Sequence, residues 1–290
     1  MGKKNFLILS LKIFITILLF FYVNKTVNFS DFRQINDIGL IFFIAVSFGF
    51  LQQFFLLCRW YFSLKTLKIN CGKKSAVKSY FIGQFLGTIS PARSGDLAKI
   101  FYLENTTKKR GIYAIILDGA IAMLTLFVVG LWKNYPQSSE ENVLIIDKIL
   151  SVAGILGILI ILIIASVIIF SRKIEAKRDV LANFTKSLSF SLLQNAVLVV
   201  QGALILKVLL PVSFAQASFA AASAYCIMPL IPFTIASIGV REFSFSLFVS
   251  AFVIDQNVKP AVFAASYVLL LCNSVIFMIP GIILFYKSGK

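Results

Sequence analysis

The sequence contains no histidine, and its acidic residues are few. Its 290 residues include 12 Asp and Glu against 28 Lys and Arg. Without histidine, the chain lacks the commonest general base, proton shuttle and metal ligand of proteins. Its four cysteines have no C-x-x-C spacing, and no D-x-D motif is present, so no disulfide framework or metal site is indicated. We expect no metal and no cofactor, and a hydrolase or metalloenzyme would need unusual chemistry.

Charged residues of either sign are scarce. They make up 14% of the chain, hydrophobic residues make up 59%, and the mean hydropathy is +0.92. Soluble domains contain about 25% charged and about 45–50% apolar residues. The composition therefore argues against a soluble α/β enzyme, a disordered chain and a nucleic-acid-binding domain. We predict a single integral membrane domain over residues 1–290.

Several apolar segments have the length of about 20 residues that a membrane-spanning helix requires. The first follows two lysines and precedes Asn24-Lys25-Thr26, which offers no small-residue cleavage site, so we interpret it as a retained signal anchor. These segments predict an all-α, polytopic helix bundle. The predicted spans are residues 6–23, 38–58, 112–131, 148–170, 185–206 and 260–286.

The basic residues are concentrated in particular loops. Most lie near the two termini or in residues 59–78, 99–110 and 172–178, whereas the remaining loops have few basic residues and carry acids such as Asp31, Asp37 and Asp147. Short cytoplasmic loops of membrane proteins are enriched in Lys and Arg in this way. We therefore predict a protein of the cell (inner) membrane with both termini in the cytoplasm. This bias accounts for the basic charge without a nucleic-acid partner.

The apolar segment 79–98 lies between two basic loops that should both be cytoplasmic. A single crossing would place one of these loops outside, so a re-entrant hairpin is the simpler solution. Four residues are expected to interrupt a helix here: Gly83, Gly87, Pro91 and Gly95. Such a backbone is tolerated at membrane depth only inside protein or beside a wet cavity. The alternative is one poorly formed complete span.

A second apolar segment, 214–254, is also interrupted, by Pro229, Pro232 and Gly239. If residues 99–110 and 172–178 are cytoplasmic and residues 185–206 cross the membrane once, this segment begins and ends on the outside. Its length fits either two spans or a deep hairpin, and the sequence leaves both open. The two interrupted segments would be entered from opposite faces, a pattern typical of transporter sites near the bilayer midplane. We therefore predict one or two re-entrant hairpins and consider an inverted repeat.

Each interrupted segment carries an arginine and an acid. Arg93 and Asp96 lie in the first, and Arg241 and Glu242 lie in the second, while Asp118 lies inside a regular predicted span. A charge in the bilayer costs about 2.5–3.5 kcal/mol and normally finds a partner or water. An arginine can bind phosphate through two hydrogen bonds, which favours a lipid phosphate as ligand. The alternative is that both pairs are structural and only close the hairpins.

Other polar residues have simpler interpretations. Arg59-Trp60 at the end of a span is typical of an interfacial anchor, although Arg59 could also attract headgroups. The spacing of Gly83 and Gly87 favours close helix packing. Six amide side chains are expected to connect helices by hydrogen bonds: Gln52, Gln53, Gln194, Asn195, Gln201 and Asn273.

Taken together, these residues resemble a known family. Four groups, in this order, carry the resemblance: Arg59-Trp60, Gly83…Pro91-Ala-Arg93-Ser-Gly95-Asp96-Leu97, Leu117-Asp118 and Pro232…Gly239-Val240-Arg241-Glu242. Over nearly its whole length the chain is similar to the lysylphosphatidylglycerol synthase transmembrane region family. That family includes the flippase half of the bacterial multiple peptide resistance factor and stand-alone membrane proteins.

The resemblance implies a protein that moves aminoacylated phospholipids or other amphiphiles between leaflets. The sequence has no counterpart of the factor's soluble acyltransferase-like domain, so we expect no synthase activity. Two positions depart from the family pattern. Gly119 follows Asp118 where relatives often have a basic residue, so Asp118 lacks its expected neighbour, and Asp96 stands where many have Glu.

The preferred hypothesis is therefore a lipid translocase, a transporter rather than an enzyme. Arg93 and Arg241 would hold the phosphate of a phospholipid, an aminoacyl-phospholipid or a polyprenyl-phosphate lipid, and Asp96, Asp118 and Glu242 would pair with arginines or meet an amine of the cargo. The alternatives are a membrane-embedded transferase acting on lipid-linked substrates and a non-catalytic membrane subunit of envelope or glycan synthesis. Phosphate-bearing membrane lipids are the expected partners, and a homo-oligomer or an envelope-synthesis partner stays open.

The first hairpin makes a topological prediction. Single cysteines placed at Ser75 and Thr106, in a variant lacking the four native cysteines, should react with a membrane-impermeant thiol reagent from the same side. Labelling from opposite sides would mean that residues 79–98 cross the membrane completely.

Overall fold

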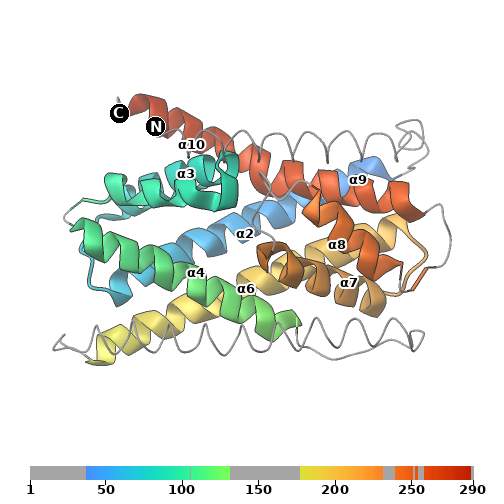
Figure 1. Ribbon diagram of the computed structural model, residues 1–290, viewed down its shortest axis with the longest axis horizontal. Helices are drawn as coiled ribbons and strands as arrows, with labels where there is room; N and C mark the ends of the chain where they lie inside the picture. Colours follow the sequence, from blue (N-terminus) through green and yellow to red (C-terminus); the bar gives the residue numbers. More distant parts are fainter. Residues whose placement is uncertain are drawn as a thin grey trace, which may run out of the picture.

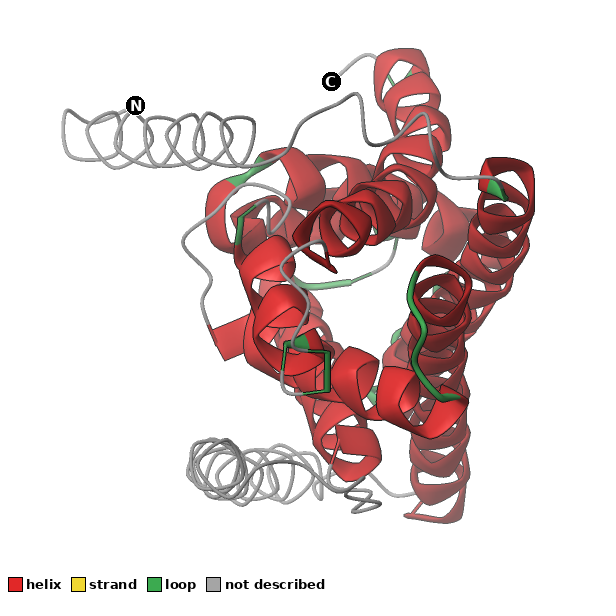
Figure 2. Ribbon diagram, turned by 90° about the vertical axis from the view of Figure 1, so that its right-hand side faces the viewer, coloured by secondary structure: helices red, strands yellow, loops and turns green. Residues whose placement is uncertain are grey.

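The computed structural model describes residues 37–104, 106–130, 177–230, 239–250, 252–253 and 258–288, and within these ranges it contains helices and no strand. Figure 1 shows the bundle along its length, and Figure 2 shows its helices packed side by side. The predicted spans 6–23 and 148–170 and the predicted break at Pro232 lie outside the described residues.

Four long apolar helices fit the length of a membrane. They are α2 (Ile38–Thr66), α4 (Lys108–Gly130), α6 (Lys177–Leu209) and a composite of α9 (Val258–Leu270), the π-helical turn η6 (Leu271–Val275) and α10 (Ile276–Lys287). The predictions of spans at 38–58, 112–131, 185–206 and 260–286 are confirmed as apolar helices of sufficient length. At 1.5 Å per residue, the 29 residues of α2 extend about 43 Å, longer than the apolar core of a bilayer.

The first interrupted segment folds back on itself. α3 (Lys73–Ile89) ends at Ser90, and Pro91 begins the 3₁₀-helical segment η2 (Pro91–Tyr102). At the open end of this first hairpin, the Ser75 hydroxyl donates to the Tyr102 carbonyl over 3.0 Å. The 17 residues of α3 reach only about 26 Å, so α3 is too short to cross an apolar core of about 30 Å.

Two of the predicted breaks are wrong, because α3 continues through Gly83 and Gly87 without interruption. A Cβ at Gly83 would overlap the Lys99 side chain, and one at Gly87 would lie 2.8 Å from the Asp96 carboxylate. These glycines therefore allow η2 to lie against α3, as their spacing suggested. The break itself is at Ser90-Pro91, where proline cannot supply the N–H that would continue α3.

The second interrupted segment also forms a pair of antiparallel helices. α7 (Phe214–Ile227) is followed by a short turn, η4 (Met228–Leu230), which contains Pro229, and the chain returns in α8 (Val240–Val249). Phe219 near the start of α7 contacts Phe248 near the end of α8, with ring centroids 6.4 Å apart. Gly239 precedes α8 with φ of 86°, a conformation that favours glycine. With 14 and 10 residues, α7 and α8 are each too short to span a bilayer alone.

The two hairpins lie toward opposite ends of the bundle (Figure 1). α3 packs on α10 and η2, whereas α7 and α8 pack on one another and on α6 and α9. α2 and α6 pack against each other through the middle of the bundle. The end of α2, the starts of α4 and α6 and the end of α10 gather at one end of the molecule, so their lysines and arginines share that end.

The two ends of the first hairpin offer exposed positions for cysteine labelling. Ser75 is buried and hydrogen-bonded, whereas the side chains of Lys74 and Thr107 are exposed at the two ends of the same hairpin. Cysteines at these two positions are therefore better reporters.

Adding one methyl group at Gly95 should weaken the packing of η2 against α3. A Cβ at Gly95 would overlap the Leu86 carbonyl and lie 2.8 Å from the backbone nitrogen of Gly87, and backbone cannot move aside cheaply. We expect Gly95→Ala to cost about 1–3 kcal/mol and to lower the apparent melting temperature in detergent. Gly119→Ala is the control, because its Cβ would meet nothing within 4 Å. Equal melting temperatures for the two variants would contradict the hairpin packing.

Candidate functional site

A buried ion pair connects α2 to α4. The Arg59 Nε lies 2.9 Å from Asp118 Oδ1, and its Nη2 donates to Asp118 Oδ2 over 3.0 Å. Both residues are buried, with 7% and 6% of their surfaces exposed. The two parallel hydrogen bonds use the planar fork of arginine, which lysine could not reproduce. Asp118, which lacks a basic neighbour in its own helix, therefore obtains one from α2.

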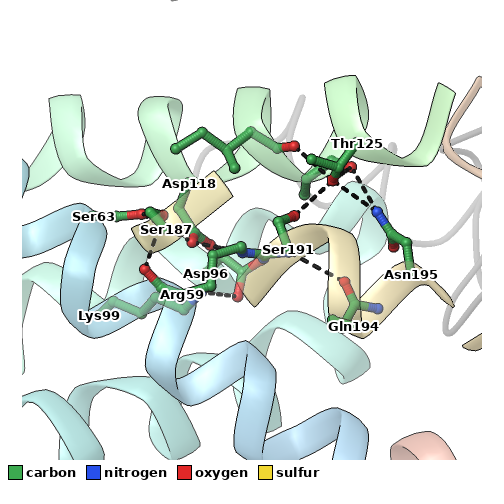
Figure 3. Close-up of polar contacts among 12 residues, drawn as sticks. Arg59, Ser63, Asp96, Lys99, Asp118, Thr125, Ser187, Ser191, Gln194 and Asn195 are labelled. Atoms are coloured by element: carbon green, nitrogen blue, oxygen red, sulfur yellow. Dashed lines mark hydrogen bonds and ion pairs between the residues drawn. The ribbon is translucent and has the colours of Figure 1, made fainter. Parts of the chain in front are cut away.

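Helix α6 completes the surroundings of this pair (Figure 3). The Arg59 Nη1 donates to Gln194 over 3.4 Å, and the Ser187 hydroxyl donates to the Arg59 carbonyl over 3.2 Å. Ser63 contacts both Asp118 and Ser187. Further along α4 and α6, a second set of hydrogen bonds joins the two helices through Thr125, Ser191 and Asn195. Polar side chains thus line the junction of three apolar helices.

A second buried cation, Lys99, belongs to the first hairpin. Its ammonium lies 3.3 Å from Asp96 Oδ1 and 5.0 Å from the centre of the Trp60 ring. The Tyr80 ring lies on another side, 5.9 Å from the same nitrogen. A carboxylate and two aromatic faces therefore stabilise a lysine that is only 6% exposed. Sequence reasoning counted Lys99 among loop charges and missed it, although its i, i+3 spacing from Asp96 was a usable signal.

The interpretation of Arg59-Trp60 as an interfacial anchor is wrong. Trp60 has no exposed surface, and its indole N–H donates to the Ser79 hydroxyl of α3 over 3.0 Å. Arg59 is equally enclosed by its partner Asp118. Both side chains face other helices because the end of α2 is covered by α3, α4 and α6. Trp60 thereby connects α2 to α3, and Arg59 connects α2 to α4.

The prediction that amide side chains connect helices is confirmed. The side chains of Gln201 and Asn273 exchange two hydrogen bonds, of 3.0 and 2.8 Å, between α6 and the π-helical turn η6. Gln52 donates to Gln201, and Gln53 donates to the Asn273 carbonyl. Tyr80 of α3 donates to Gln53 over 2.6 Å. These five residues, the amide cluster, connect the first hairpin to the fourth span, which is formed by α9, η6 and α10.

The charged residues of the second hairpin behave differently. Glu242 accepts the backbone N–H of Gly239 through Oε2 over 2.5 Å, and so caps the start of α8. Within the described part of the chain, Arg241 forms no ion pair with Glu242 or any other acid. Its Nε and Nη1 are buried and have no hydrogen-bond partner there. The alternative of a structural Arg241–Glu242 pair therefore does not hold.

The predicted site residues fall into separate groups. Arg59 with Asp118, and Asp96 with Lys99, are brought together in the first half of the bundle, while Arg241 and Glu242 lie in the second hairpin. The side chain of Arg93 lies outside the described residues, so its predicted phosphate contact stays a prediction. Among the described residues, no group of three or more Cys, Asp or Glu is arranged to hold a metal. Among the described residues, Arg241 is the cation of these groups that has no carboxylate partner.

One comparison with known proteins gave a match. The family model described as the Lysylphosphatidylglycerol synthase TM region matches residues 8–281, nearly the whole chain. The matched range contains both hairpins and every charged residue of the predicted site. Neither the curated proteins nor the solved structures gave a match.

The Arg59–Asp118 pair should be essential as a pair. Asp118→Asn leaves the Arg59 charge buried without a counter-ion, which we expect to cost about 3–5 kcal/mol. Arg59→Gln combined with Asp118→Asn removes both charges and should recover a large part of this loss. Thermal unfolding of both single variants and the double variant in detergent measures the coupling. Asp179→Asn, at an exposed position of α6, is the control, and additive losses at 59 and 118 would contradict the pairing.

Proposed function

We propose that this chain, which belongs to the lysylphosphatidylglycerol synthase TM region family, is a lipid translocase that moves phosphate-bearing lipids between leaflets. The cargo class comprises phospholipids, aminoacyl-phospholipids and polyprenyl-phosphate lipids. The headgroup passes through the protein between the two hairpins, while the acyl chains remain in the surrounding lipid. No covalent chemistry is required of the chain.

The observation that carries the proposal is the state of Arg241. Arg59 and Lys99 are buried cations that each have a carboxylate, whereas Arg241 has none among the described residues. Arg241 is half-buried, and its Nε and Nη1 are buried without a partner, which is costly unless an anion compensates them. A lipid phosphate supplies that anion with a geometry suited to arginine. Arg93 is assigned the same role in the first hairpin.

The short helices support re-entrant hairpins. α3, α7 and α8 are each shorter than an apolar core of about 30 Å, and each folds against a neighbour in sequence. A long helix, a hairpin and a second long helix follow one another twice, as α2–α3/η2–α4 and as α6–α7/α8–α9 with α10. We assign these two halves to an inverted repeat whose hairpins enter from opposite faces, as in many secondary transporters.

The charge distribution supports an orientation. The lysine- and arginine-rich ends of α2, α4, α6 and α10 lie together at one end of the bundle (Figure 1). By the positive-inside rule this end is cytoplasmic, in the cell (inner) membrane. The first hairpin then opens to the cytoplasm and the second to the opposite side.

Transport measured in vesicles tests the proposal. Purified protein is reconstituted, and the movement of fluorescent phospholipids and polyprenyl-phosphate lipids is followed by quenching of the outer leaflet. Arg241→Gln removes the free guanidinium, so we expect the protein-dependent rate to fall about 10- to 100-fold, the loss of a charge-assisted hydrogen bond of about 1.5–3 kcal/mol.

Arg110→Gln is the control, because Arg110 is exposed at the start of α4. It should leave the rate unchanged. Rates equal to those of protein-free vesicles for every lipid would overturn the proposal, as would equal rates for wild type and Arg241→Gln.

A further inference from the structure

Buried polar atoms without partners are concentrated on three neighbouring helices. Within the described residues, they lie mainly on α7, α8 and α9, which pack against one another. Glu242 is 1% exposed and Ser266 is fully buried. The atoms are Ser223 Oγ, Tyr225 OH, Arg241 Nε and Nη1, Glu242 Oε1, Ser266 Oγ and Tyr267 OH.

Such a group needs a physical explanation, because buried polar atoms are nearly always hydrogen-bonded. Each one left without a partner costs about 1–3 kcal/mol. Elsewhere in the described bundle, buried polar side chains such as those of the amide cluster form direct hydrogen bonds. The exception in α7, α8 and α9 therefore indicates a place where a ligand supplies the missing partners.

The chemistry of the atoms defines that ligand. Tyr225 packs against α8, with its ring centroid 5.4 Å from that of Phe245, and both Tyr225 and Arg241 offer donors, so this side of the group suits an anion. Glu242 Oε1 offers an acceptor, and Tyr267 lies on α9, which packs on α8. Glu242 stands in the first turn of α8, and its other oxygen, Oε2, already accepts the Gly239 N–H, so only Oε1 is left for a ligand. The ligand must therefore present an anion and a hydrogen-bond donor close together.

We propose that Tyr225, Arg241, Glu242 and Tyr267 form a headgroup-binding site that selects a phosphodiester whose alcohol part carries a hydroxyl or primary ammonium group. Arg241 and Tyr225 hold the phosphate, and Glu242 accepts the donor beside Tyr267. This selectivity rests on the proposed function, since it assumes that the free guanidinium receives a lipid phosphate. A choline headgroup has no N–H or O–H, so it leaves Glu242 without a partner and is rejected.

Binding of short-chain lipids to the full-length protein in detergent tests the site by titration calorimetry. The probes are dioctanoyl lipids with glycerol, ethanolamine and choline headgroups, dioctanoyl phosphatidic acid, and dioctanoylglycerol without phosphate. Wild type should bind the glycerol and ethanolamine lipids about 10- to 100-fold tighter than the choline lipid. Inorganic phosphate and free phosphoethanolamine serve as competitors, and competition by either shows that the headgroup chemistry suffices without a lipid.

Two variants separate the roles. Glu242→Gln should abolish the preference over choline while leaving choline-lipid affinity unchanged, and Arg241→Gln should weaken all phosphate-containing probes. Tyr267→Phe tests the same side of the site without touching the cap of α8. Arg110→Gln is again the control. Equal affinity of wild type for all headgroups, or selectivity retained in both Glu242→Gln and Tyr267→Phe, would overturn the site.

Binding and transport fail independently. Selective binding without vesicle transport would sustain this site and overturn the translocase, whereas transport without headgroup preference would sustain the translocase and overturn this site.

Discussion

The cost of removing a positive charge from water governs this fold. Two cations in the first half of the bundle are buried, and each has a carboxylate partner. Arg59 pairs with Asp118 of α4, and Lys99 pairs with Asp96, three residues earlier in η2. Arg241 is half-buried, and no acid of the described chain forms an ion pair with it. A guanidinium removed from water is costly without an anion, and this difference from Arg59 and Lys99 underlies the proposal that Arg241 receives a ligand.

The amide cluster and the fourth span connect the two hairpins. The α10 half of this span packs on α3, and the α9 half packs on α8, with the π-helical turn between the two halves. Gln201 and Asn273 fix this turn against α6, and Tyr80 joins it to the first hairpin. The turn therefore lies between the parts of the span that contact the two hairpins. π-Helical turns occur often at functional sites, in keeping with such a position.

Hydropathy and proline positions were sufficient to predict the long helices and the first break. The run of apolar residues defines α2, and Pro91 ends α3 for reasons local to the backbone. The pairing of Arg59 with Asp118 could not be predicted, because it joins residues 59 positions apart and depends on how α2 and α4 pack. The interpretation of Trp60 as an interfacial anchor was wrong for the same reason, because the sequence at the end of a span does not show whether lipid or protein covers it. Arg241 was predicted as a site residue, but its lack of a partner is a property of the packed structure alone.

The central claim is that Arg241 lies in a polar environment sheltered from hydrocarbon, and cysteine reactivity in lipid vesicles tests it most directly. Phe243, two residues along α8, is 61% exposed on the outer surface and serves as the comparison. In a variant without native cysteines, Arg241→Cys should react with a charged, water-soluble methanethiosulfonate, whereas Phe243→Cys should react only with a lipid-soluble maleimide. Equal resistance of both positions to the charged reagent would contradict the account.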